Sequence, residues 1–113
     1  MAVILDLVDI RIPSVNAKYG KGFYLNPEYR EFKSLVAYGC IGSLIPPPYF
    51  LVIDIATYLD IDNALKCIID GVAASGAIDN DKNILRLIVN KTPLKRGQLG
   101  RLKIECNSFH RTD

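Results

Sequence analysis

Hydrophobic and polar positions alternate at the start of the chain, over residues 3–12. The apolar positions are Val8, Ile10 and Ile12, and the polar positions between them are Asp9 and Arg11. A period of two residues is typical of a strand with one buried face, and Pro13 ends it. The pattern therefore predicts a first strand over residues 3–12.

Three later segments have the composition of strands. Residues 49–56 are rich in β-branched and aromatic residues with Asp54 as the one charge, so we expect a strand in the interior of the sheet. Residues 85–89 and 99–106 predict two more strands. The basic segment between them contains Pro93, Lys95, Arg96, Gly97 and Gly100. We expect these two strands to form a basic hairpin.

Helical spacing of apolar residues predicts two helices. Asn26 can cap the first, Pro27 suits its first turn, and it should end at Gly39 or Gly42. The second should begin at Asp62 or Asn63, with Asp62 as a plausible N-cap, and end with Gly76 as the residue after its last turn.

The elements thus follow the order β-α-β-α-β-β. Strands that alternate with helices indicate an α/β or α+β fold with a mixed sheet and two packed helices. A chain of 113 residues without a repeat or linker fits one small domain, residues 1–113.

Composition narrows the class of protein. Half of the residues are apolar, and 23% are charged, which is typical of globular domains. The apolar start is interrupted by Asp6 and lacks a basic leader, so we expect neither a signal peptide nor a membrane span. The three cysteines, Cys40, Cys67 and Cys106, form no C-x-x-C pair. They indicate buried thiols, no zinc site and a cytoplasmic location.

Charge is distributed unevenly along the chain. Residues 58–81 hold five aspartates and one lysine, whereas residues 82–113 hold eight basic and two acidic side chains. An acidic centre beside a basic flank suits a protein that holds a cation and meets a polyanion, although an uneven solvated surface explains the charge equally well.

The acidic centre predicts a metal site. Asp60 and Asp62 are two residues apart where a strand ends, Lys66 lies one helical turn later, and Asp81 precedes the next strand. We expect these side chains to meet at one end of the sheet, with Asp70 and Asp79 in support. Three carboxylates suit Mg²⁺, and a lysine can stabilise the charge that develops in phosphodiester hydrolysis.

Other chemistries do not fit the spacing. A calcium loop that starts at Asp79 would need glycine at its sixth position and glutamate at its twelfth, where the chain has Ile84 and Asn90. His110 is the only histidine and lies near the C-terminus, so a nucleophile has no well-placed base.

A purely structural interpretation of the aspartates stays open. Asp62 can cap its helix, Asp62, Lys66 and Asp70 can form a ladder of ion pairs, and residues 79–81 can form a turn. Basic and aromatic residues in the glycine-containing segment 14–25 suit stacking on unpaired bases, although packing on the core is the commoner use of such rings.

The pattern D-x-D-N-x-x-K-x-x-x-D, from Asp60 to Asp70, followed by Asp81, resembles the RusA-type Holliday junction resolvases of bacteria and prophages. Pro13-Ser14-x-Asn16 is similar to that family's P-S-x-N opening, and residues 91–101 look like its basic C-terminal ribbon. The chain departs from the family where Tyr58-Leu59 stands in place of a basic segment and Asn80 in place of an acidic residue.

The resemblance implies a homodimer that binds four-way DNA junctions and introduces paired nicks with Mg²⁺, for which Mn²⁺ can substitute, in a bacterial cell, phage or prophage. It implies that Asp60, Asp62 and Asp81 bind the metal and that Lys66 is the essential lysine. No membrane or small-molecule cofactor is expected. The expected DNA contacts are Asn16, Lys18, Lys21, Lys33, Lys91, Lys95, Arg96 and Arg101.

Two alternatives from other classes remain. One is a non-catalytic module that binds branched DNA, although such a module should have lost a ligand or the lysine. The other is a metal-dependent phosphoesterase that acts on different nucleic-acid structures.

Overall fold

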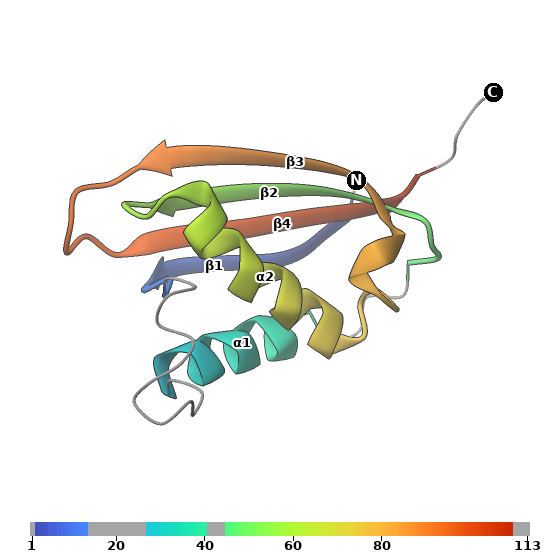
Figure 1. The fold of residues 1–113 in the computed structure, drawn as a ribbon, viewed down its shortest axis with the longest axis horizontal. Helices are drawn as coiled ribbons and strands as arrows, with labels where there is room; N and C mark the ends of the chain where they lie inside the picture. The colour runs from blue at the N-terminus through green and yellow to red at the C-terminus, as the bar shows by residue number, and fades with distance from the viewer. Residues whose placement is uncertain (1, 14–26, 41–44, 110–113) are drawn as a thin grey trace.

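The structure is a computed structural model that describes residues 2–13, 27–40 and 45–109, without the side chain of Asn63. The elements follow in the order β1 (Ala2–Ile10), α1 (Pro27–Gly39), β2 (Tyr49–Thr57), α2 (Ile61–Ser75), a short 3₁₀ helix η2 (Asp81–Asn83), β3 (Ile84–Pro93) and β4 (Gly100–Ser108). This order confirms the predicted β-α-β-α-β-β arrangement with a mixed sheet and two helices (Figure 1). No described helix has the length and apolar character needed to cross a membrane.

The four strands form one sheet in the spatial order β1-β4-β2-β3. β2 and β3 are parallel and are connected through α2, whereas β4 is antiparallel to both β1 and β2. The predicted hairpin is therefore wrong, because β2 separates β3 from β4. Leu94 N donates to Thr57 O at 3.1 Å, which fixes the β3–β4 connector where it passes the end of β2.

The composition of the two last strands explains this order. Leu102, Ile104 and Cys106 of β4 are fully buried, and such a strand is best placed between two neighbours. β3 carries Arg86, Asn90, Lys91 and Pro93, which suit an edge strand.

One face of the sheet forms the core with the helices. In β2 buried side chains alternate with half-buried ones, which confirms its predicted place in the interior of the sheet. Leu51, Ile53 and Ile55 point into the core, and α2 crosses in front of the sheet with α1 beside it (Figure 1). Asp54 lies on the opposite face, where it accepts a hydrogen bond from Asn90 Nδ2 at 2.9 Å.

β1 does not keep the simple alternation that its sequence predicts. Its register with β4 shifts between Val8 and Ile10, and Asp9 has a φ of 54°. This irregularity turns the side chains, so that Val8 is 59% exposed while Ile12 is buried beyond the end of the strand. The expectation that Val8, Ile10 and Ile12 share one face is therefore wrong.

Both predicted helices are present, with one correction. α2 begins at Ile61, so Asp60 occupies the N-cap position and Asp62 lies in the first turn. Asp62 is not the cap, and the Asp60 side chain makes no capping hydrogen bond. Gly76 follows the helix with a φ of 80°, as predicted.

Candidate metal and nucleic-acid site

The D-x-D pair lies at an exposed helix start. Asp60 and Asp62 follow the carboxyl end of β2 and flank the first residue of α2. Unpaired backbone N–H groups and the helix dipole make this position favourable for negative charge. Both residues are exposed, so their carboxylates are accessible to solvent and to a cation.

Asp81 is the first residue of η2, and hydrogen bonds between the residues around it stabilise this segment. Asn80 Oδ1 accepts from Lys82 N at 3.0 Å, and Asp79 Oδ1 accepts from Asn83 Nδ2 at 2.9 Å. The hydrogen bond from Asn83 is the main reason that the pKa of Asp79 is lowered. Asp79 thus supports the turn, and Asp81 remains exposed.

The chain topology separates these two groups of carboxylates. Asp60 lies just beyond the Thr57↔Pro93 end of the parallel β2–β3 pair, and Asp81 lies just before the Tyr49↔Ile84 end. At about 3.3 Å per residue, the pair is roughly 26 Å long. Figure 1 shows the start of α2 at one end of the sheet and η2 at the other. The expectation that Asp60, Asp62 and Asp81 meet at one end of the sheet is wrong for a single chain.

The arrangement of the potential metal ligands agrees with this separation. Within residues 2–13, 27–40 and 45–109, no three His, Cys, Asp or Glu side chains lie close enough together to hold a metal ion.

Lys66 forms an ion pair with Asp70, one helical turn further along α2. Lys66 Nζ is 3.0 Å from Asp70 Oδ1, and Tyr29 Oη donates to Asp70 Oδ2 at 2.5 Å. The hydrogen bond to Asp70 and then the charge of Asp70 raise the pKa of Lys66, with a smaller contribution of the same sign from Asp81. The sequence allowed a ladder of ion pairs from Asp62 through Lys66 to Asp70. Within the described residues, only the Lys66–Asp70 pair of this ladder forms.

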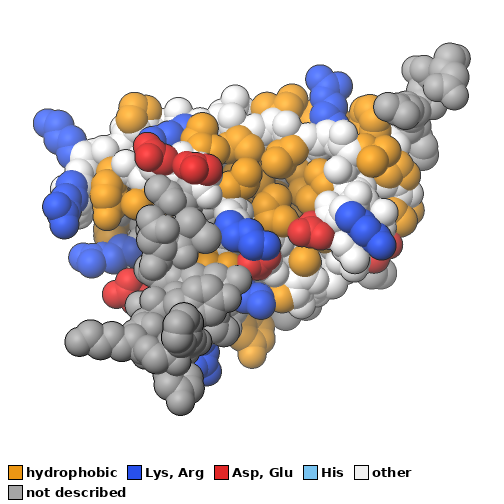
Figure 2. Space-filling model, viewed as in Figure 1, with side chains coloured by type: hydrophobic (Ala, Val, Ile, Leu, Met, Phe, Trp, Pro, Cys, Tyr) orange, Lys and Arg blue, Asp and Glu red, His pale blue; other side chains and the backbone are white. Residues whose placement is uncertain are grey.

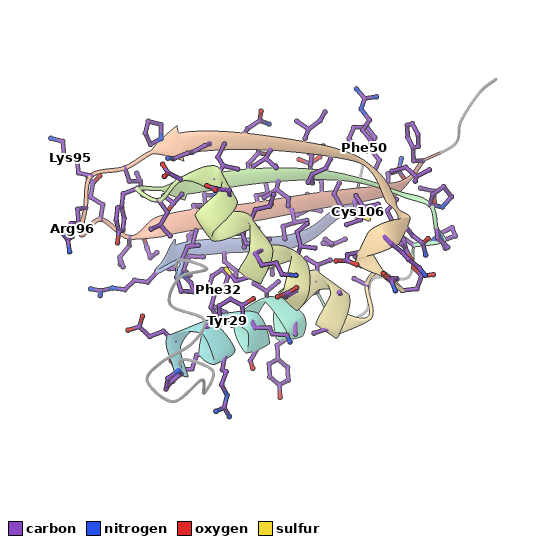
Figure 3. All side chains as sticks on the ribbon, in the orientation of Figure 1. Tyr29, Phe32, Phe50, Lys95, Arg96 and Cys106 are labelled. Carbon is purple, nitrogen blue, oxygen red and sulfur yellow. The ribbon has the colours of Figure 1, made fainter. Side chains whose placement is uncertain are left out.

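The expected DNA-binding residues are spread over several elements. Lys95 and Arg96 are exposed on the β3–β4 connector, at the same end of the sheet as the start of α2 (Figures 1 and 3). Lys33 on α1 and Lys91 on β3 are half-buried. Arg101 on β4 is paired with Asp6, with Nη2 3.1 Å from Oδ2. The remaining three, Asn16, Lys18 and Lys21, lie outside the described residues.

A cavity of about 750 Å³ lies beside the basic connector. Ile12 and Phe32 are apolar residues in its lining, and Arg11, Tyr58 and Arg96 are polar ones. The sequence assigned no role to Arg11 or Tyr58. Their positions directly after β1 and β2 would have indicated this cavity only if it had been known that these strands flank β4 and end at the same end of the sheet.

The cysteines are placed as predicted. All three are free and buried, and burial raises the pKa of Cys67 to about 12 and that of Cys40 to about 11. They are therefore protonated core residues rather than nucleophiles. His110 lies outside the described residues.

No protein-family model matches this chain, and no curated protein is significantly similar to it.

Proposed function

We propose that this protein is a Mg²⁺-dependent endonuclease that nicks branched DNA, with four-way junctions as its substrate, in DNA recombination or repair in a bacterial cytoplasm. The observation that carries the proposal is the exposed Asp60–Asp62 pair at the start of α2, on the same end of the sheet as Lys95 and Arg96. Carboxylates that bind a hard cation beside side chains that bind phosphate are what phosphodiester hydrolysis requires.

The position of Lys66 supports the same chemistry. Its ammonium is held by Asp70 and lies within the electrostatic influence of Asp81. A fixed positive charge near a metal-binding carboxylate can stabilise the negative charge that builds up on the phosphate during hydrolysis.

A complete metal site then requires two chains. Because Asp60 and Asp62 lie at the opposite end of the β2–β3 pair from Asp81, one chain supplies only part of the proposed ligand set. In the proposed homodimer, Asp60 and Asp62 of one chain meet Asp81 and Lys66 of the other. A two-fold axis creates two such sites, which matches a substrate cut on two opposed strands.

The surface between α2 and β3 suits this dimer. Leu87 and Val89 pair with residues of β2 that face the helices, yet Leu87 is 39% exposed. Ile61 of α2 is also 39% exposed, and Figure 2 shows hydrophobic side chains gathered beside α2. This apolar strip runs between the two ends that carry the carboxylates. A second copy placed across it about a two-fold axis exchanges those ends.

Cleavage of synthetic DNA tests the proposed function. The purified protein is incubated with a four-way junction, a linear duplex or a flap, in Mg²⁺ or in EDTA. We expect paired nicks in the junction that need Mg²⁺. Asp62→Asn and Lys66→Ala should abolish cleavage, while at least one of them still binds the junction.

Asp54→Asn is the matched control, because it removes the same charge from the open face of the sheet. It should cleave at the normal rate. Equal cutting of linear duplex, or full activity of Asp62→Asn, would contradict the proposal, and preferred cutting of the flap would favour the broader phosphoesterase.

A non-catalytic module that binds branched DNA is the second candidate. The separation of Asp60 and Asp62 from Asp81 in one chain favours it, because a monomer would lack the full ligand set. Junction binding without cleavage in either Mg²⁺ or Mn²⁺ would support this candidate.

A further inference from the structure

Lys66 has two possible acidic partners on α2. Asp62 lies four residues before it and Asp70 four residues after it, and either spacing brings the charges together on a helix surface. In isolated helices, the pair with the acidic residue on the N-terminal side is the more favourable one. The helix alone therefore favours Asp62, yet Lys66 pairs with Asp70 at 3.0 Å.

Asp70 also contacts a residue of the other helix. Tyr29 of α1 is 2% exposed, and its hydroxyl donates to Asp70 Oδ2 at 2.5 Å. Asp70 thus uses one oxygen for Tyr29 and the other for Lys66. The phenol both satisfies a half-buried carboxylate and fixes its orientation, so that its second oxygen faces the lysine.

Close contact between α1 and α2 allows the Tyr29 hydroxyl to reach Asp70. A Cβ at Gly71 would lie 2.7 Å from Val36 Cβ, so α1 and α2 approach each other next to Asp70. Figure 3 shows Tyr29 on α1 beside α2.

The pairing of Lys66 with Asp70 affects the charge around Asp62. With Lys66 directed to Asp70, the ammonium points along α2 away from the start of the helix. Asp62 makes no ion pair with any residue in the described ranges, so its carboxylate is not neutralised by the lysine.

We propose that Tyr29 is a positioning residue that, through Asp70, turns Lys66 away from Asp62 and so keeps Asp62 available to a divalent cation. The roles of Asp62 and Lys66 rest on the proposed function, whereas the choice of ion-pair partner does not.

The partner of Lys66 can be measured directly by NMR. With ¹⁵N in lysine side chains and ¹³C in aspartate carboxyl groups, coupling across the hydrogen bond identifies the carboxylate that Lys66 contacts. We expect coupling to Asp70 in the native protein. In Tyr29→Phe, which keeps the ring and loses the donor, we expect coupling to Asp62 instead.

Tyr49→Phe is the matched control, because Tyr49 is as buried as Tyr29 and its hydroxyl accepts from Asp79 N instead. It should leave the Lys66–Asp70 coupling unchanged. Coupling to Asp62 in the native protein, or retained coupling to Asp70 in a folded Tyr29→Phe, would overturn the proposal. The coupling measured in the native protein tests the proposal even if Tyr29→Phe does not fold.

A Mn²⁺ titration tests the consequence for the cation. An ion pair four residues apart on a helix is worth up to about 0.5 kcal/mol, so Tyr29→Phe should bind Mn²⁺ about twofold more weakly, measured by line broadening at Asp62. Unchanged Mn²⁺ binding after a shift of Lys66 to Asp62 would overturn this part. If the NMR results hold and no DNA is cleaved, the proposed function fails and the role of Tyr29 in choosing the partner stands.

Discussion

At the scale of single residues, burial decides the chemistry of the thiols. An odd number of separated cysteines was enough to predict free, buried thiols, because burial is the usual state of cysteine outside disulfides and metal sites. The partner of Lys66 was not predictable in this way. Asp62 and Asp70 are equally spaced from it, and the choice depends on Tyr29, 41 residues from Asp70 in the sequence.

The buried thiols predict a loss of stability in alkaline solution. The pKa of Cys67 is raised from 9.0 in the unfolded chain to about 12, and that of Cys40 to about 11. Below pH 9 both states keep the proton; above it the unfolded chain ionises first, so the free energy of unfolding falls as the pH rises toward 11 or 12. Each such thiol contributes a slope of up to about 1.4 kcal/mol per pH unit.

Urea unfolding at pH 8, 9 and 10 measures this slope. Cys67→Ala should reduce it, whereas Ile68→Val, a change at an equally buried neighbour without a titrating group, should not. The same slope in Cys67→Ala as in the native protein would show that this thiol is not responsible.

At the scale of elements, local patterns located the helices and strands but not their arrangement. Apolar spacing located α1 and α2 because that signal lies within each helix, whereas the predicted cap Asp62 was wrong and the predicted cap Asn26 lies outside the described residues. The hairpin of β3 and β4 was wrong, since their order depends on which strand can fill the interior of the sheet beside β2.

The contact between α1 and α2 predicts that Gly71 cannot be enlarged freely. An alanine there favours the helix by about 1 kcal/mol, but its Cβ would meet Val36 Cβ at 2.7 Å. Overpacking of a core contact costs about 1–3 kcal/mol, so we expect a net loss of stability in Gly71→Ala. Urea unfolding provides the measurement.

Val36→Gly removes both the Cβ and the Cγ1 that the new methyl group would meet. Gly71→Ala should therefore be tolerated better in the Val36→Gly background than in the native protein, which a double-mutant cycle detects. Additive effects of the two changes would mean that this contact does not limit the helix packing.

At the scale of the whole molecule, the crossover through α2 determines where the carboxylates lie. The sequence predicts that Asp81 joins Asp60 and Asp62, because the chain turns back after the second helix. In a β-α-β unit with parallel strands, the helix returns the chain to the end where the first strand began, which is the end opposite Asp60. The candidate residues were predictable from their spacing, but their separation depends on the direction of β3.

The two-chain site predicts complementation between two inactive variants. In a dimer of one Asp62→Asn chain and one Asp81→Asn chain, one site carries both changes and the other carries neither. We therefore expect the mixture, after co-refolding, to recover nicking of one strand of the junction, although each variant alone is inactive.

Asp62→Asn mixed with Lys66→Ala should behave in the same way, since the proposed dimer groups Lys66 with Asp81 of the same chain. A mixture of Asp60→Asn and Asp62→Asn should remain inactive, because those two residues come from the same chain and each site keeps one change. Failure of the first mixture, with dimers verified by light scattering, would mean that the site does not span two chains.

The position of β4 also affects how the protein folds during synthesis. Among the described strands β1 pairs with β4 alone, and β4 follows β1, β2 and β3 in the sequence. β2, α2 and β3 can assemble as soon as they leave the ribosome, but β1 must wait until residues 100–108 have been made. Until then the apolar side chains of β1 are exposed. A ribosome that stalls before residue 100 therefore holds a chain whose sheet lacks β4 and cannot bind β1. A chaperone can bind such a chain, or the chain can aggregate.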